Sequence, residues 1–192
     1  VYRETYLSDQ GKFNKACTCA TTILDKIDIG QLANFEQQRQ ETRNLVEQIG
    51  AVTSQDHSRP LFSDPDFVAL LATTIRNAAD LGMPQLALTL TDSVTRAGDT
   101  LGPDHPSTLI SRHSLAVAYR DAGRLDEAIA LFEQTLEDST RILGPHHPNT
   151  LTSRNNLAYA YQNAGRLNEA IALYEQTLED STRILGPHHP NT

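Results

Sequence analysis

Residues 151–192 read LTSRNNLAYAYQNAGRLNEAIALYEQTLEDSTRILGPHHPNT, and residues 109–150 carry the same 42-residue unit with eight substitutions. Internal copies of this length are typical of proteins that stack one supersecondary unit repeatedly. In both copies a Leu- and Ala-rich segment is followed by a glycine and then by a second segment whose apolar residues have helical spacing. The repeat therefore predicts an all-α fold in which each unit is a helix–turn–helix.

Proline and glycine mark the boundaries of the predicted helices. Pro106 and Pro148 suit the first turn of a helix, and Gly123 and Gly165 suit the left-handed position that follows its last turn. A longer second helix is then expected, over 125–143 in one unit and 167–185 in the other, each ended by Gly-Pro. Small side chains allow the helices of such a unit to approach closely. We expect this at Ala116, Ala128, Ala158 and Ala170.

The same register extends upstream, because the Leu-Gly-Pro junction also occurs at Leu101. We expect these segments along the chain: 1–52, a degenerate helical repeat plus an additional helix; 53–64, a linker; 65–105, a diverged unit with helices over 65–80 and 84–101; 106–147 and 148–192, the two near-identical units. The chain stops within a repeat junction. We therefore expect it to be part of a longer protein in which the array continues.

Composition and motifs argue against several classes of function. The formal net charge of −8 argues against a nucleic-acid partner, because affinity for phosphate backbones depends on Lys and Arg. The sequence has no apolar run of membrane length and no signal-like start, so we expect a cytoplasmic protein without a membrane partner. Phosphate-binding loops, dinucleotide fingerprints and a nucleophile in catalytic context are missing from the sequence. We therefore expect neither an enzyme nor a bound cofactor.

Cysteine and histidine could indicate a disulfide or a metal site. Cys17 and Cys19 stand two residues apart, so on a helix they point in different directions and are expected to be reduced thiols. Histidines recur at the repeat junctions: His105, His146, His147, His188 and His189. A turn before the helix-opening proline explains them better than a metal site, because the later junctions lack acidic or Cys partners at ligand spacing.

The eight substitutions between the copies are concentrated on one side of the first helix. Six of them follow the spacing i, i+3, i+4, i+7, i+10, i+11, which is one face of a helix. The opposite face, which includes Leu115 and Tyr119, is unchanged, as core packing requires. We call the substituted positions the variable face: Ile110, His113, Ser114, Val117, Arg120 and Asp121 in one unit, and Thr152, Asn155, Asn156, Tyr159, Gln162 and Asn163 in the next.

Two interpretations of the variable face stay open. As a ligand groove, it has amides at Asn155 and Asn156 that can donate to and accept from a peptide backbone. It also has an aromatic platform at Tyr159 and a guanidinium at Arg120 that suits a carboxylate. As drift, it would reflect the low cost of substitution at exposed positions. Drift should also have altered the exposed face of the second helix, which differs only at 126/168 and 132/174, so the groove is favoured.

The unchanged positions resemble the tetratricopeptide repeat. The matching residues are Leu157, Ala158, Tyr161, Gly165, Ala170 and Tyr174 in one unit, and Leu115, Ala116, Tyr119, Gly123, Ala128 and Phe132 in the other. The 42-residue length and the Leu-Gly-Pro-x-His-Pro junction are similar to the long repeats of kinesin light chains, and to bacterial multidomain proteins in which such arrays follow a nucleotide-binding domain. The resemblance implies a right-handed α-α superhelix whose first helices line a concave peptide-binding groove.

The expected function is therefore that of a protein- or peptide-binding scaffold. Two alternatives remain at this point. The array could be the regulatory arm of a signalling ATPase whose catalytic domain lies outside this chain. It could also associate head to tail with itself, because the last unit has no polar capping helix after it in the sequence.

Overall fold

The computed structural model describes residues 34–54 and 58–185. Within these ranges every regular element is helical, which confirms the predicted all-α fold. The expected degenerate repeat with Cys17 and Cys19 lies outside the described residues, as do His188 and His189. The chain forms two compact units, Val1–Ser111 and Arg112–Thr192, and the boundary between them falls within helix α6 (Pro106–Asp121).

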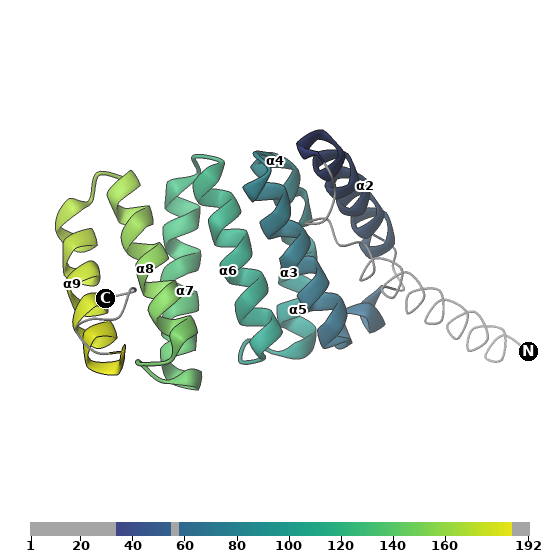
Figure 1. Cartoon of the computed structure of the whole chain (residues 1–192). Helices are drawn as coiled ribbons and strands as arrows, with labels where there is room; N and C mark the ends of the chain where they lie inside the picture. The colour runs from purple at the N-terminus through teal and green to yellow at the C-terminus, as the bar shows by residue number, and fades with distance from the viewer. Residues whose placement is uncertain (1–33, 55–57, 186–192) are drawn as a thin grey trace, which may run out of the picture. The chain divides into compact units, whose positions relative to one another are not determined.

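The first unit is built from helices of unequal length (Figure 1). In chain order they are α2 (Phe35–Thr53), the 3-10 helix η2 (Arg59–Ser63), α3 (Pro65–Asp80), α4 (Pro84–Ala87), the 3-10 helix η3 (Leu88–Leu90), α5 (Thr91–Leu101) and the start of α6. The helix expected over 84–101 is thus divided into three. The hydroxyls of Thr89 and Thr91 each donate to the carbonyl three residues back, and such bonds favour the tighter 3-10 turn.

The described residues of the segment expected as a linker, 53–54 and 58–64, pack into the first unit. They include η2, whose Phe62 is fully buried. The guanidinium of Arg96, on α5, lies 4.7 Å from the centroid of the Phe62 ring. The same guanidinium donates to the carbonyl of Thr53, at the end of α2, and to the hydroxyl of Ser58. The signal for this packing in the sequence is the apolar pair Leu61-Phe62 within an otherwise polar stretch.

The second unit consists of the end of α6, α7 (Leu125–Leu143), α8 (Pro148–Asn163) and α9 (Leu167–Leu185). Helix α8 packs against both α7 and α9 (Figure 1). Small and apolar side chains fill the core between these helices: Ala116, Ala128, Ile129, Phe132, Leu157, Ala160, Tyr161 and Ala170. The four alanines predicted at close helix approaches are all buried.

A glycine allows each helix pair to reverse direction. Gly123 and Gly165 have φ values of +76° and +75°, a left-handed conformation that residues with side chains rarely adopt. At the second of these turns, the Arg166 N–H donates to the Tyr161 carbonyl over 2.9 Å and the Gly165 N–H donates to the Gln162 carbonyl over 3.0 Å. This pair of bonds satisfies carbonyls that would be left unpaired at the end of α8.

Glycine, proline and histidine together form the junction between α7 and α8. Gly144 has φ 93° and ψ 159°, a region that is essentially restricted to glycine, and the following Pro145 disfavours a helical conformation at Gly144. The Nδ1 of His147 then accepts the N–H of Asn149 over 3.2 Å and caps the start of α8. Among the described residues, no group of three or more His, Cys, Asp or Glu side chains is placed to hold a metal ion. None of the described helices has the length and apolarity needed to cross a membrane.

Candidate functional site

Most of the variable face lies at the surface of its helices. Its exposed members are Ile110, Asp121, Thr152, Asn155, Tyr159, Gln162 and Asn163, and its half-buried members are His113, Val117, Arg120 and Asn156. Ser114 is 1% exposed, so it packs inside the structure and offers no surface to a ligand. Ile110 belongs to the first compact unit and the other positions to the second. The candidate site is therefore considered on the second unit alone.

His113 and Asn156 contact each other across α6 and α8. The amide nitrogen of Asn156 lies 2.9 Å from Nε2 of His113, and the hydroxyl of Ser153 lies 3.5 Å from its Nδ1. Because an amide nitrogen donates, this contact fits the tautomer in which Nε2 of His113 accepts. The edge-to-face packing of His113 on Phe132, with ring centroids 5.5 Å apart, fixes the imidazole further. Asn156 is thus used in packing neighbouring repeats together, whereas Asn155 is exposed beside it.

Arg120 packs against Tyr159, the aromatic residue of the variable face. Its guanidinium lies 5.0 Å from the centroid of the Tyr159 ring, within the range of a cation–π interaction. The same guanidinium forms an ion pair with the neighbouring Asp121, with an N–O distance of 2.7 Å. The carboxylate that the sequence predicted for Arg120 is therefore supplied by the chain itself. Tyr159 remains 43% exposed, so the guanidinium of Arg120 contacts its ring without covering it.

A second tyrosine extends this surface toward α9. The hydroxyl of Tyr174 donates to the side-chain carbonyl of Gln162 over 3.2 Å. Partial burial raises the pKa of Tyr174, and the nearby Tyr159 raises it further. Position 174 is phenylalanine in the preceding copy, at Phe132, so this hydrogen bond is specific to the last unit. Tyr159, Gln162 and Tyr174 together form one polar and aromatic surface on α8 and α9.

These contacts link positions at which the two copies differ. His113 meets Asn156 and Phe132, Arg120 meets Tyr159, and Gln162 meets Tyr174. Part of the variation between the copies therefore reflects packing between neighbouring helices, a third explanation beside groove and drift. The sequence contained one signal of this packing between helices. Position 132/174 on the second helix differs between the copies, as do the first-helix residues that it contacts, His113 for Phe132 and Gln162 for Tyr174.

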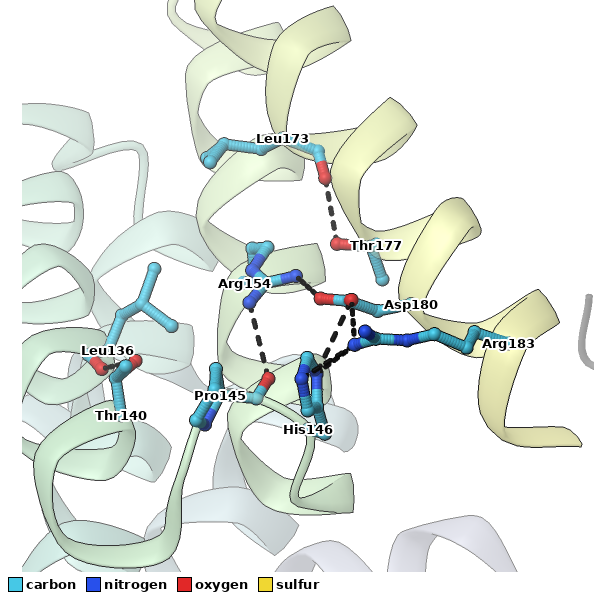
Figure 2. Close-up of polar contacts among 9 residues, drawn as sticks. All are labelled: Leu136, Thr140, Pro145, His146, Arg154, Leu173, Thr177, Asp180 and Arg183. Atoms are coloured by element: carbon cyan, nitrogen blue, oxygen red, sulfur yellow. Dashed lines mark hydrogen bonds and ion pairs between the residues drawn. The ribbon is translucent and has the colours of Figure 1, made fainter.

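A cluster of ion pairs in the second unit lies away from the variable face, and its two arginine–aspartate contacts occur in both copies. Figure 2 shows Arg154, which is 4% exposed, donating to Asp180 over 2.7 Å and to the Pro145 carbonyl over 3.3 Å. Arg183 and His146 also approach Asp180, at 3.0 and 3.3 Å. The hydrogen bond from Arg154 lowers the pKa of Asp180, and the charges around it add to that effect. This cluster ties α8, α9 and the preceding junction together.

The corresponding cluster occurs one repeat earlier. Arg112 donates to Asp138 over 3.1 Å, and Arg141 pairs with the same carboxylate at 2.8 Å. Sequence reasoning missed both clusters, although Arg and Asp at these positions are unchanged between the copies. Buried arginine requires a partner, and the partner here is 26 residues away on the following helix.

Tyr161, on α8, forms a hydrogen bond with a residue of α7. Its hydroxyl donates to the carboxylate of Glu133, and the guanidinium of Arg166 lies 4.2 Å from the centroid of its ring. Burial raises the pKa of Tyr161 to about 12, and the hydrogen bond to Glu133 contributes to the increase. Tyr119 has the same stacked arginine one repeat earlier, with Arg124 at 4.7 Å. The tyrosine that ends each first helix is thus a packing residue rather than part of the exposed surface.

Helix pairs of this kind, joined by a tight glycine turn and stacked through small residues, define an α-helical repeat protein. The family model of the tetratricopeptide repeat matches residues 76–139, 115–179 and 152–192. The chain belongs to the tetratricopeptide repeat family, as its resemblance to that repeat predicted. Repeats of this family generally mediate interactions between proteins.

Solved structures give the same result. A Podosopora anserina protein described as a kinesin light chain with nearly identical TPR-like repeats is 33% identical, with a TM-score of 0.64 over 81% of this chain and 72% of that chain. A variant of it, in which a methionine replaces a glutamine, is 28% identical, with a TM-score of 0.63 over 93% of this chain and 92% of that chain. BtubC of P. vanneervenii is 23% identical, with a TM-score of 0.56 over 81% of this chain and 60% of that chain. At this identity the likeness supports a common fold and nothing about function. No curated protein sequence matched the chain.

Proposed function

We propose that the chain is a scaffold that holds an extended segment of a partner protein on the exposed residues of α8. The observation that carries this proposal is the arrangement around Tyr159, whose ring is exposed on one side and braced by Arg120 on the other. A ring that is already held in place loses little conformational freedom when a ligand stacks on it. Aromatic residues of this kind contribute strongly to protein interfaces.

The neighbours of Tyr159 favour a peptide backbone as the ligand. Asn155, Gln162 and Asn163 are exposed amides on the same helix, and each can donate as well as accept a hydrogen bond. The guanidinium of Arg120, which lies against Tyr159, is paired with Asp121, so these two charges compensate each other. We therefore expect recognition to depend on backbone hydrogen bonds and aromatic stacking rather than on a charged motif. On this proposal the chain is neither an enzyme nor a nucleic-acid binder, and it acts in the cytoplasm.

The test uses peptides selected from a displayed random library against the whole chain. Their affinities are then measured by fluorescence anisotropy for the native chain and for the double variant Asn155→Ala, Tyr159→Ala. We expect a loss of at least about 30-fold, because an anchoring residue at an interface is typically worth about 2 kcal/mol. Asn156 is left unchanged, since its replacement would disturb the contact with His113.

The matched control is Gln134→Ala, which removes an exposed amide on α7. It should leave both affinity and thermal stability unchanged. Selected peptides that bind the double variant as tightly as the native chain would overturn the proposal, and so would a library that yields no binding peptide. The regulatory-arm and head-to-tail alternatives stay predictions.

A further inference from the structure

Arg120 and Asp121 form an ion pair in the last turn of α6. Two nitrogens on one edge of the guanidinium, Nε and Nη2, lie 2.8 and 2.7 Å from the same oxygen of Asp121. The ring of Tyr159 lies against the same guanidinium. The side chain of Arg120 is 14% exposed, so water and salt screen this pair less than a pair at the open surface. The positive charge beside Tyr159 is therefore compensated from within the chain.

The ion pair is particular to one copy of the repeat. The corresponding residues in α8 are Gln162 and Asn163, which are amides without charge. Helix α8 folds and ends at Asn163, as α6 ends at Asp121. The fold of a unit therefore does not require a charge at either position.

The carboxylate of Asp121 changes what Arg120 offers to a ligand. A guanidinium without a partner binds carboxylates strongly, because two of its N–H groups on one edge match the two oxygens. With Asp121 in place, a ligand carboxylate meets an edge that is already occupied and a like charge beside it. Like charges placed together at an interface disfavour that ligand, whereas a neutral ligand does not compete for the guanidinium.

We propose that Asp121 is a specificity-determining residue, which makes the surface around Tyr159 disfavour acidic segments and accept neutral ones. This inference rests on the peptide-binding function proposed above for α8, and it specifies the chemistry of the partner. The partner segment stacks an aromatic or apolar side chain on Tyr159 and carries no aspartate or glutamate next to that side chain.

The test compares the native chain with Asp121→Asn. This variant keeps the size of the side chain, removes its charge and introduces the residue that the next copy has at Asn163. Peptides are selected from a displayed random library against the whole native chain. In the tightest peptide, each residue that flanks the aromatic or apolar anchor is replaced in turn by glutamine and by glutamate. Fluorescence anisotropy at about 0.15 M salt then gives the affinity of each peptide for each chain.

The quantity that decides the test is the ratio of the affinities for the glutamate and glutamine peptides. For the native chain we expect glutamate to bind about three-fold more weakly than glutamine at one flanking position or more. In Asp121→Asn the same glutamate peptide should bind about three-fold more tightly, so the ratio shifts by about 10-fold. The reason is that the charge of Arg120 is then compensated by the ligand, through a charge-assisted hydrogen bond.

Asp126→Asn is the matched control. It removes one negative charge from an exposed position on α7, and it also introduces the residue of the next copy, Asn168. The net charge of the chain changes by the same amount in both variants, so a general electrostatic effect would appear in both. We expect the ratio in Asp126→Asn to stay within about two-fold of the native value, because Asp121 still compensates Arg120.

A second control removes the guanidinium. The double variant Arg120→Gln, Asp121→Asn gives α6 the same two residues as Gln162 and Asn163 and should lose the preference for glutamate. Circular dichroism confirms that each variant is folded. A shift toward glutamate in Asp121→Asn that is missing from both controls supports the proposal.

Three results would overturn the role of Asp121. They are an unchanged ratio in Asp121→Asn, an equal shift in Asp126→Asn, and a shift that persists when Arg120 is also replaced. The peptide-binding function is tested separately, because it fails when Asn155→Ala, Tyr159→Ala leaves affinity unchanged. Affinity that depends on Tyr159, together with an unchanged ratio, removes only the role of Asp121. A library that yields no binding peptide overturns both.

Discussion

Ile129 and Ile171 occupy the same position in two copies of one helix, and they provide a direct comparison of buried and exposed packing. The first is 5% exposed and the second 54% exposed. We predict that Ile129→Ala destabilises the chain much more than Ile171→Ala does. The two substitutions remove the same atoms from the same helical position, so their difference reports on packing alone.

The expected magnitudes follow from the exposed fractions. Replacing a buried Ile by Ala removes apolar contact and leaves a cavity, which typically costs about 2–5 kcal/mol. Ile129 lies among Ala116, Phe132 and Leu157 in a closed cluster, so we expect about 3 kcal/mol there. At Ile171 about half of the apolar area is already in water and no closed cavity forms, so we expect less than about 1 kcal/mol. The gain in helix propensity, about 0.4 kcal/mol, is the same at both sites and cancels.

Urea denaturation followed by far-ultraviolet circular dichroism and by tyrosine fluorescence measures both losses. Agreement of the two probes checks that unfolding is cooperative, which stacked repeats do not always show. Equal losses at the two positions would refute the reasoning, because they would mean that the face of α9 is covered in solution as that of α7 is covered by α8.

Two further predictions concern pH. The pKa of Tyr161 in the folded chain, about 12, lies above its ordinary value of 10.0, so the stability it contributes is present below pH 10 and is lost as pH rises through 12. Spectrophotometric titration should therefore show a late tyrosine step that Tyr161→Phe abolishes, and an unchanged titration in that variant would contradict the assignment. The pKa of Asp180 is lowered from 3.8, chiefly by the hydrogen bond from Arg154, so its contribution is present above that pH and is lost as pH falls through the lower folded value. Asp180→Asn should cost about 2 kcal/mol near neutral pH, between the values for exposed and buried ion pairs, and should flatten the acid side of the stability curve. If the stability of Asp180→Asn falls with decreasing pH as steeply as that of the native chain, another carboxylate controls the loss of stability in acid.

The fold was predictable from the sequence because its determinants are local and occur twice. Pro106 and Pro148 open α6 and α8, and Gly123 and Gly165 allow the left-handed turns that follow these helices. The break within 84–101 was not predictable from periodicity, because it depends on hydroxyl bonds within single turns. The packing of Phe62 against Arg96 also escaped prediction, since it joins residues that are distant in sequence.

The candidate site was predictable as a face of a helix but not as a set of contacts. Spacing places Asn155 and Tyr159 on one side of α8, where the structure has them exposed. Spacing along one helix does not predict which residues of a neighbouring helix these side chains contact. The pairing of His113 with Asn156 and the burial of Ser114 therefore required the packed structure.

The ion-pair clusters have a consequence for how such a chain can grow. Arg112 and Asp138 lie 26 residues apart, as do Arg154 and Asp180, so each pair is contained within one 42-residue unit. A duplicated stretch of coding sequence therefore carries both members of its own pair, together with the glycine that makes its turn. A newly inserted copy needs no compensating change in its neighbours for its charges to be neutralised. Each unit therefore carries its own charge compensation when it is duplicated, and its substitutions can collect on the face where neighbouring copies contact each other.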